Sequence, residues 1–305
     1  MTTAANTHRR TALVTGGTDG IGKAVARGLA RQGLRVIIVG RDAYKGRSAE
    51  AEIRGASGNP DVMFIRSDVA LVRNMQELAD EITAMAPALH YLVHAAGIVR
   101  GKYTLTPDGI ESNFAINYLA RFVLTTRLLS ALVGAGRIGS SSRVLILGGA
   151  ARSGTIHFND PNLTRGFTVA RFVGQFCQAN DVLAIELARR LAESDTARGR
   201  VTINCLKLGV VKTGIRREFP AWMKVLVPLV MDPFLAQTAV GVANHALRLL
   251  LDPAYEGTTG KLFLLIRNFK SIEPTAYARK PETGRRLWAL SERLVDATAR
   301  KEIAQ

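Results

Sequence analysis

Short runs of consecutive apolar residues alternate along the chain with longer segments in which apolar residues recur every three or four positions. The first kind is typical of β-strands buried on both faces, and the second of amphipathic helices. Seven strand-like runs occur: TALVT at 11–15, RVIIV at 35–39, VMFI at 62–65, YLVH at 91–94, RVLIL at 143–147, VTINCL at 201–206 and KLFLL at 261–265. Helical segments include 21–32, 72–86, 110–133 and 169–193. This alternation predicts a doubly wound α/β fold, a seven-stranded parallel sheet flanked by helices.

No repeat, low-complexity tract or linker divides the chain, so residues 1–305 are expected to form one domain. The most membrane-like stretch, FPAWMKVLVPLVMDPFLA at 219–236, is interrupted by Lys224, Pro228 and Asp232 and is short for a membrane span. We therefore expect no stable membrane span, and instead a flap at 214–236 that covers a substrate pocket. A C-terminal tail at 266–305 follows the last predicted strand.

The loop after the first strand carries a glycine motif, TGGTDGIG. Ligands in such sheets bind beyond the carboxyl ends of the strands, and the amino end of a helix favours negative charge. Gly16 allows a sharp turn, Gly20 lets backbone amides approach a pyrophosphate, and Gly22 lets the helix pack on the strand. A purely structural turn is the alternative, but the strand-loop-helix context favours dinucleotide binding. The residues predicted to bind are Gly16, Thr18, Asp19, Gly20, Ile21 and Gly22.

The second strand ends in VIIVGRDAYKG, which bears on the choice of nucleotide. An acidic residue at this tip commonly binds the ribose hydroxyls of NAD, whereas an arginine accommodates the 2′-phosphate of NADP. Arg41 follows Gly40 directly, so NADP is predicted. Asp42 is the residue that would favour NAD instead, and Arg41 as a solvated loop residue is the alternative reading.

Charge and cysteine content restrict the class of partner. The chain has 41 basic and 25 acidic residues, a formal net charge of +16, but no Lys/Arg block with interleaved aromatic residues. An anionic small molecule such as a phosphorylated cofactor therefore fits better than nucleic acid. The two cysteines are too few for a disulfide framework or a zinc cluster, so no metal site is expected. Residues 1–10 lack an apolar run, and a cytoplasmic location is expected.

Several motifs together resemble the short-chain dehydrogenase/reductase family, whose domain is a Rossmann fold, and the resemblance covers nearly the whole chain. TGGTDGIG matches its TGxxxGxG loop, and GRDAYKGRSAEAEIR and RRLWALSERLV resemble its retinol-dehydrogenase branch. SDV at 67–69 resembles its adenine-contacting step, HAAG at 94–97 its NNAG motif, and LGVVKT at 208–213 its nicotinamide-amide loop. The resemblance thus implies further cofactor contacts from Asp68, Val69, Ala95, Ala96, Gly97, Gly209, Val211 and Thr213.

The resemblance breaks at the catalytic positions. Family members reduce a carbonyl with a serine, a tyrosine and a lysine, and the corresponding positions here hold Gly149, Val173 and Cys177. The pair is not displaced, because no tyrosine in the chain is followed four residues later by lysine. A positioned general acid contributes about 10² to 10⁴ in rate, so ordinary ketone reduction is expected to be impaired.

Three residues are the candidates for the remaining catalytic role. The resemblance places Asn117 on the family's conserved asparagine, Tyr118 lies beside it, and His157 follows the fifth strand. Each has a structural alternative: a backbone-bonding asparagine, a packing tyrosine and an ordinary loop histidine. His94 and Ser153 are weaker candidates, and Cys177 is expected to be an inert thiol.

Three functions remain open. The first is an NADP(H)-dependent oxidoreductase that acts without the Tyr-Lys relay on an apolar or polycyclic small molecule such as an iminium, enone or ketone. The second is a redox-silent cyclase, isomerase or lyase, and the third is a non-catalytic NADP-binding protein. The resemblance also raises homodimer pairing through the helices at 110–133 and 169–193, and leaves the oligomeric state open.

Overall fold

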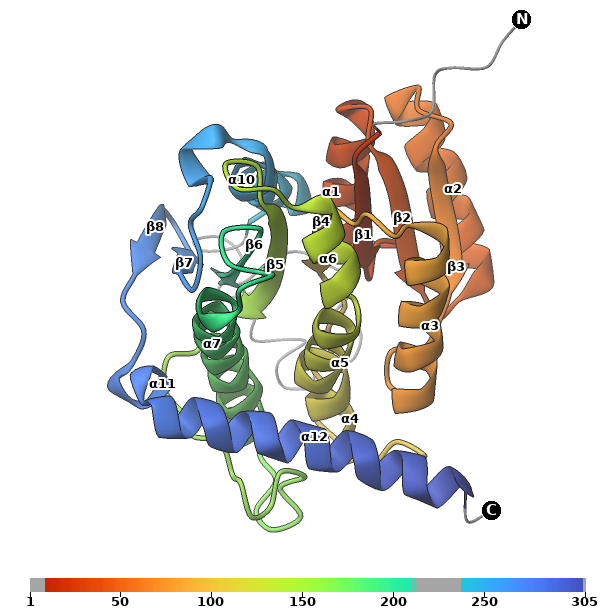
Figure 1. The fold of residues 1–305 in the computed structure, drawn as a ribbon. Helices are drawn as coiled ribbons and strands as arrows, with labels where there is room; N and C mark the ends of the chain where they lie inside the picture. Colours follow the sequence, from red (N-terminus) through yellow and green to blue (C-terminus); the bar gives the residue numbers. More distant parts are fainter. Residues whose placement is uncertain (1–8, 210, 212–236, 304–305) are drawn as a thin grey trace, which may run out of the picture.

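The computed structural model describes residues 9–209, 211 and 237–303, and its centre is an eight-stranded sheet (Figure 1). The strand order is β3-β2-β1-β4-β5-β6-β7-β8. The strands are β1 (Thr11–Thr15), β2 (Arg35–Gly40), β3 (Val62–Arg66), β4 (Tyr91–His94), β5 (Ser142–Gly149), β6 (Val201–Leu208), β7 (Leu262–Leu265) and β8 (Phe269–Ile272). All neighbouring pairs are parallel except β7 and β8.

Helices cover both faces of the sheet, which confirms the doubly wound fold. The helical elements are α1 (Gly20–Arg31), α2 (Ala43–Ser57), α3 (Val72–Met85), α4 (Ser112–Phe114), η1 (Ala115–Leu119), α5 (Ala120–Arg127), α6 (Leu129–Ala135), α7 (Val169–Glu193), α10 (Ala239–Leu251), η4 (Pro253–Tyr255), α11 (Ala276–Arg279) and α12 (Pro281–Ile303). Alternate strand residues enter two separate cores, because successive side chains point to opposite faces. Leu13 packs with α3, α5 and α7, whereas Val14 packs with α1 and α10.

The prediction of seven parallel strands was one strand short. β8 pairs antiparallel with β7, with Leu265 opposite Phe269. It is a four-residue edge strand in which only the two end residues are partly buried, so it lacks the continuous apolar run by which the other strands are recognised. Phe269 anchors it by stacking on Phe263 with ring centroids 5.4 Å apart.

The C-terminal helix α12 crosses α7, α5 and α3 on one face of the molecule (Figure 1). The rings of Trp288 and Phe122 lie 4.9 Å apart, and the guanidinium carbon of Arg190 lies 3.9 Å from the Trp288 ring centroid. The resemblance raised homodimer pairing through the helices at 110–133 and 169–193. In this structure the chain's own C-terminal helix covers one face of them, so pairing there would require α12 to move.

The predicted flap at 214–236 lies outside the described residues. Among the residues that are described, no single helix is long and apolar enough to cross a membrane, although Ser112–Arg127 and Leu129–Ala135, bent by 55°, meet the length and composition criteria as a pair. Most residues of this pair belong to the core beneath the sheet, as expected for helices that pack on it.

Candidate active site

The loop after β1 forms a tight cradle at the carboxyl end of the sheet. Gly16 and Gly20 have positive φ angles of 67° and 55°, which glycine adopts without strain. A β-carbon on Gly22 would lie 2.2 Å from the carbonyl oxygen of Gly16, so the helix can approach the strand only with glycine there. Asp19 caps α1 by accepting from the Gly20 amide, and the following first-turn amides have no intrahelical acceptor.

The loop after β4 packs directly on this cradle. A β-carbon on Gly16 would lie 2.7 Å from the backbone nitrogen of Ala96, and the Ala95 amide donates to the Thr15 carbonyl. Gly209 follows β6, and its amide donates to the Leu265 carbonyl. Asp68, Val69, Ala95, Ala96, Gly97, Gly209 and Val211 thus all follow carboxyl ends of parallel strands, whereas Thr213 lies outside the described residues.

The tips of β2 and β3 present two arginines. Arg41 is exposed after β2, and the Arg66 side chain at the end of β3 donates to the Arg41 carbonyl at 3.2 Å. Asp42 is the N-cap of α2, and its carboxylate accepts from the Lys45 amide at 3.0 Å. This hydrogen bond holds the pKa of Asp42 below its usual value. Sequence reasoning missed Arg66, although a cation directly after an apolar run at this edge was a usable signal.

Asn117 fastens the loop after β4 to η1, a single π-helical turn. Its side-chain oxygen accepts from the Ile98 amide at 3.1 Å, and its amide group donates to the carbonyls of Ile98 and Asn113 at 2.8 and 2.9 Å. Both amide hydrogens are therefore used on backbone. These contacts fit the structural alternative for Asn117, an asparagine that bonds to backbone. Its role is then to position the loop after β4.

The structure contradicts Tyr118 as a proton donor. Its side chain is fully buried, and its hydroxyl lies 2.6 Å from the hydroxyl of Ser291 on α12. Burial raises the pKa of this phenol above its ordinary value. Tyr118 therefore packs between η1 and the C-terminal helix. Its side chain points away from that of Asn117 because consecutive helical residues point in different directions.

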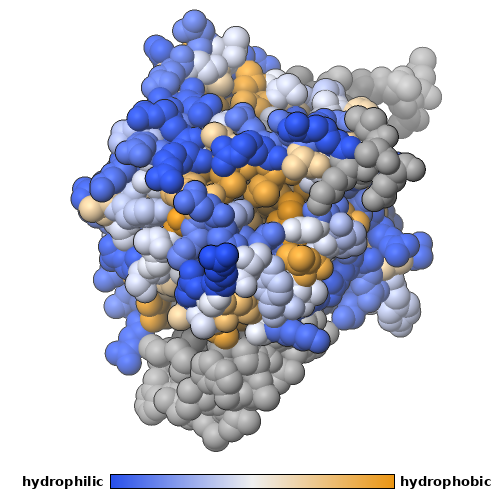
Figure 2. Space-filling view, turned by 90° about the horizontal axis from the view of Figure 1, so that it is seen from below, coloured by the Kyte–Doolittle hydropathy of each residue, from blue (hydrophilic) through white to orange (hydrophobic). Residues whose placement is uncertain are grey.

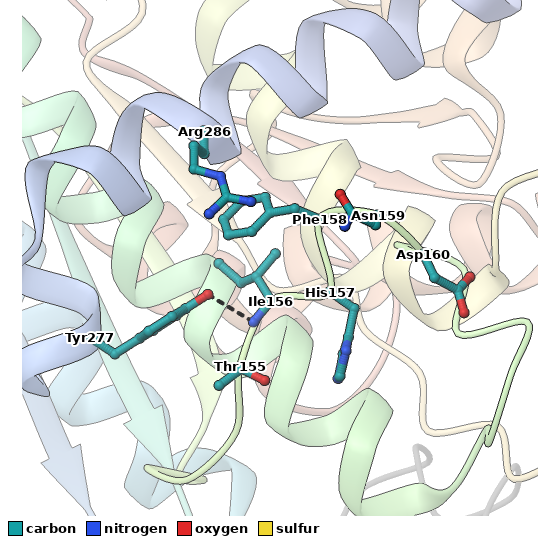
Figure 3. A pocket seen from close by; sticks show the side chains of 8 residues that line it. All are labelled: Thr155, Ile156, His157, Phe158, Asn159, Asp160, Tyr277 and Arg286. Carbon is teal, nitrogen blue, oxygen red and sulfur yellow. Dashed lines mark hydrogen bonds between the residues drawn. The ribbon is translucent and has the colours of Figure 1, made fainter.

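His157 also lies away from the expected position. It lines a cavity of about 380 Å³ with Thr155, Ile156, Phe158, Asn159, Asp160, Tyr277 and Arg286 (Figure 3). The His157 backbone amide donates to the Gln175 side chain, and its ring lies 3.4 Å from Arg171. Residues 171 and 175 are on the side of α7 opposite 173 and 177, since each residue turns the helix by about 100°. Burial and the nearby Arg171 lower the pKa of His157, so it is neutral at pH 7.

Apolar groups fill the space at positions 149, 173 and 177, where the resemblance implies the family's catalytic residues. A β-carbon on Gly149 would lie 2.8 Å from Cys177 Sγ, so a serine there would collide with the thiol. Cys177 is fully buried, and burial raises its pKa to about 11 despite the nearby Lys207. Val173 is partly buried against the core. None of these three side chains can exchange a proton at neutral pH.

A buried charged group lies behind these positions, which sequence reasoning missed. Lys207 Nζ lies 2.7 Å from both carboxylate oxygens of Asp181, one helical turn after Cys177. Burial opposes the charged amine, but the carboxylate outweighs it and raises the pKa of Lys207. Arg121 on α5 is 4% exposed and donates to the Leu147 and Ala96 carbonyls. In the sequence, the only sign of these buried charges was that polar residues occur within an apolar strand and within core helices. Lys207 thus acts on Cys177 from a distant position in the sequence, but burial outweighs it and keeps the thiol protonated.

Histidine 94 is another buried group behind the site. Its side chain is 1% exposed, and its Nε2 lies 2.8 Å from the hydroxyl of Thr125. Burial and the positive Arg121 lower the pKa of His94 to about 3, so the ring is neutral. This excludes it as a general acid at neutral pH. The weaker candidate Ser153 is exposed on the loop after β5.

The end of the molecule beyond the strand carboxyl ends is apolar at its centre, as the view from below shows (Figure 2). Aromatic rings from two loops and α7 contact one another here: Tyr103 meets Phe167 edge-on at 5.3 Å, and Phe167 stacks on Phe172 at 5.1 Å. Such a surface favours an apolar substrate.

Comparisons with known proteins agree with this geometry. The short chain dehydrogenase family model matches residues 10–147. Retinol dehydrogenase 12 of Mus musculus is 33% identical over 92% of this chain and 84% of its own length, and polyprenol dehydrogenase of Mus musculus is 32% identical over 94% and 84%. A solved structure of a protein from Mycobacterium paratuberculosis has a TM-score of 0.72, 25% identity and coverage of 94% and 93%. The RhlG/NADP complex of Pseudomonas aeruginosa has a TM-score of 0.67, 23% identity and coverage of 84% and 94%. The chain therefore belongs to the short-chain dehydrogenase/reductase family, in the branch of the retinol dehydrogenases.

Proposed function

We propose that this protein is an NADP(H)-dependent oxidoreductase that transfers hydride to or from an apolar small molecule without a Tyr-Lys proton relay. The observation that carries the proposal is the pairing of a nucleotide cradle with three residues that offer no exchangeable proton, Gly149, Val173 and Cys177, at the positions where the resemblance implies the catalytic residues. Membership of an oxidoreductase family supports hydride transfer, and function is assigned from the site because one fold hosts many activities.

The residues at the strand ends fit a nicotinamide dinucleotide. Gly16 and Gly22 let the loop after β1 pack tightly on the loop after β4 and on itself, and Gly20 adopts a positive φ angle. The first-turn amides at the amino end of α1, which have no intrahelical acceptor, suit a diphosphate. Three of the solved neighbours are complexes with NADP, which supports the same cofactor class here. The bound nucleotide would supply a hydride at its nicotinamide ring.

The choice of NADP over NAD rests on the tip of β2. Asp42 is engaged in capping α2, so it does not offer its carboxylate freely to a ribose. Arg41 and Arg66 place two cations at the same edge, which suits a 2′-phosphate. The Asp42 alternative that would favour NAD is thereby weakened.

Among the expected acceptors, an iminium ion makes the smallest demand on a proton donor. When hydride adds to an iminium carbon, the product amine is neutral and no proton is required at that carbon. Positioning alone can then accelerate the reaction. The aromatic contacts of Tyr103, Phe167 and Phe172 provide apolar contact area, and two relatives are named for retinol and polyprenol, which are apolar alcohols.

The cofactor proposal is tested by titrating the wild-type protein, R41Q and the matched control R47Q with NADPH and NADH. Arg47 is an exposed residue of the neighbouring helix α2. R41Q is expected to weaken NADPH binding about tenfold and to leave NADH binding unchanged, because one charge-assisted phosphate contact is lost. Equal weakening by R47Q, or tighter binding of NADH by the wild-type protein, would contradict the assignment of NADP.

Oxidoreductase activity is tested separately with a panel of iminium ions, enones and ketones, following nicotinamide oxidation and product together. One nucleotide oxidised per product is the expected result. Product formed at an unchanged rate without nucleotide would instead identify a redox-silent cyclase, isomerase or lyase. Nucleotide binding without turnover of any substrate would favour a non-catalytic binding protein.

A further inference from the structure

Arg121 is a buried cation directly beneath the carboxyl ends of β4 and β5. Its Nη2 donates to the carbonyls of Leu147, near the end of β5, and Ala96, in the loop after β4, at 2.9 and 3.3 Å. A β-carbon on Gly97 or on Gly148 would lie 4.0 Å from the guanidinium. The charge thus lies close under the backbone of the two loops where the nicotinamide half of the nucleotide is expected.

The charge of Arg121 is not balanced by the residues that the structure describes. Its Nε and Nη1 atoms are buried and have no hydrogen-bond partner there, and no described carboxylate forms an ion pair with it. Its titratable neighbours are the thiols of Cys177 and Cys205 and the ring of His94. These are neutral, since burial raises the pKa of both thiols and lowers that of the histidine.

The other buried ions nearby do not supply a counter-charge. Lys207 and Asp181 satisfy each other, with both carboxylate oxygens 2.7 Å from the amine. Burial lowers the pKa of Arg121 to about 10, so it remains protonated at neutral pH. One uncompensated positive charge therefore persists behind the site. A buried charge interacts strongly with any ligand charge close to it, because little solvent screens it.

We propose that Arg121 is the fixed cation of the nicotinamide end of the site, and that it makes the protein bind the reduced nucleotide more tightly than the oxidised one. This inference rests on the proposed function. The oxidised nicotinamide ring carries one positive charge and the reduced ring carries none, while the rest of the nucleotide is unchanged. A cation close to the ring would thus disfavour only the oxidised form and hold the bound couple toward the reduced nucleotide.

The competing interpretation is that Arg121 only ties β4 to β5 through its two carbonyl contacts. A structural tie would change the stability of the protein and the binding of both nucleotides together. An electrostatic role changes the ratio of the two dissociation constants. The ratio therefore separates the two roles.

The experiment measures dissociation constants for NADPH and NADP⁺ with the wild-type protein, R121Q, R121K and the control R143Q. Arg143 is also buried and also donates to backbone carbonyls, but it lies at the amino end of β5. We expect the wild-type protein to prefer NADPH by about tenfold or more, and R121Q to lose about tenfold of that preference. R121K retains the charge and most of the preference, and R143Q retains the wild-type ratio.

Folded R121Q with an unchanged ratio would overturn the inference, as would a wild-type protein that binds NADP⁺ as tightly as NADPH. If R121Q does not fold, the wild-type and R121K ratios decide: a preference for NADPH in both supports the inference, and its absence from either overturns it. A wild-type protein that binds neither nucleotide removes the proposed function as well. Binding of both with equal affinity removes only the role of Arg121.

Discussion

At the scale of single residues, Gly149, Val173 and Cys177 stand where the resemblance implies the family's catalytic residues, and they fit one another in space. The glycine at 149 makes room for the sulfur of Cys177, and the helix places Val173 one turn earlier. A buried thiol behaves as a small hydrophobic group, so packing fills the positions at which the resemblance implies a proton-transfer chain. The charges that remain, on Arg121, Lys207 and Asp181, are buried behind this packing.

Both thiols are predicted to be unreactive in the folded protein. Cys177 and Cys205 are fully buried, and burial raises their pKa to about 11 and about 12. Titration with a thiol reagent near pH 8 should therefore modify neither until a denaturant is added, after which both react. Rapid modification of the native protein, mapped to Cys177, would show an exposed or activated thiol.

Restoring a serine at position 149 should destabilise the protein. In G149S the new side chain meets Cys177 Sγ at less than van der Waals distance, and overpacking costs about 1–3 kcal/mol. The G149S/C177A double variant should recover much of this loss in denaturant unfolding, so the two effects are not additive. G55S is the control, because no atom lies within 4 Å of its new β-carbon. Full additivity would contradict the contact.

At the scale of elements, the C-terminal helix α12 explains why Tyr118 takes the packing role that was its structural alternative. Its hydroxyl partner Ser291 is 173 residues away in sequence, and nothing local to Tyr118 indicates it. Trp288 and Arg190 extend the same contact across α5 and α7. α12 therefore covers the helix surface through which the resemblance raised homodimer pairing. That surface lies inside the molecule here.

Y118F is expected to lower the free energy of unfolding by about 1 kcal/mol and to leave turnover unchanged. The variant removes one buried hydrogen bond, that to Ser291, and no group at the strand carboxyl ends. The measurements are denaturant unfolding and nicotinamide oxidation with the best substrate of the panel. A hundredfold loss of turnover without a loss of stability would return Tyr118 to the catalytic site.

The contacts that Glu256 makes with Ser141 and Arg143 should make the free energy of unfolding depend on pH in the acidic range. Burial alone would raise the pKa of Glu256, but the bonds from Ser141 and Arg143 outweigh it and lower the pKa to about 2. A carboxylate with a lowered pKa stabilises the fold fully above its unfolded pKa of about 4.5, and this contribution is lost as the pH falls towards 2. Unfolding of E256Q should lack this part of the acid dependence. Identical profiles for E256Q and the wild-type protein would contradict the ion pair.

At the scale of the whole molecule, the sequence predicted those strands and helices that a local residue pattern determines. Runs such as TALVT and YLVH became β1 and β4 with the predicted ends, and the helix at 169–193 became α7. β8 was missed because a short edge strand needs no apolar run, and the segment 110–133 was broken into α4, η1, α5 and α6, which the residue pattern did not indicate.

The candidate site was predictable only in its nucleotide half. Glycines such as Gly16 and Gly22 are required by local backbone geometry, which a sequence records directly. The position of His157 depends on how the loop after β5 runs along α7, and the environment of Arg121 depends on three strands that meet through long-range packing. Such contacts have no signature in the spacing of residues.

The central proposal for this protein is that hydride delivery persists while the proton relay is absent. The most direct measurement compares the rates at which the protein oxidises NADPH with an iminium ion and with a ketone of the same shape. We predict that the ketone reacts at least about a hundredfold more slowly, because its reduction needs a general acid that Gly149, Val173 and Cys177 do not provide. Equal rates, with a bell-shaped pH profile for the ketone, would show that a proton donor is present and would contradict the claim.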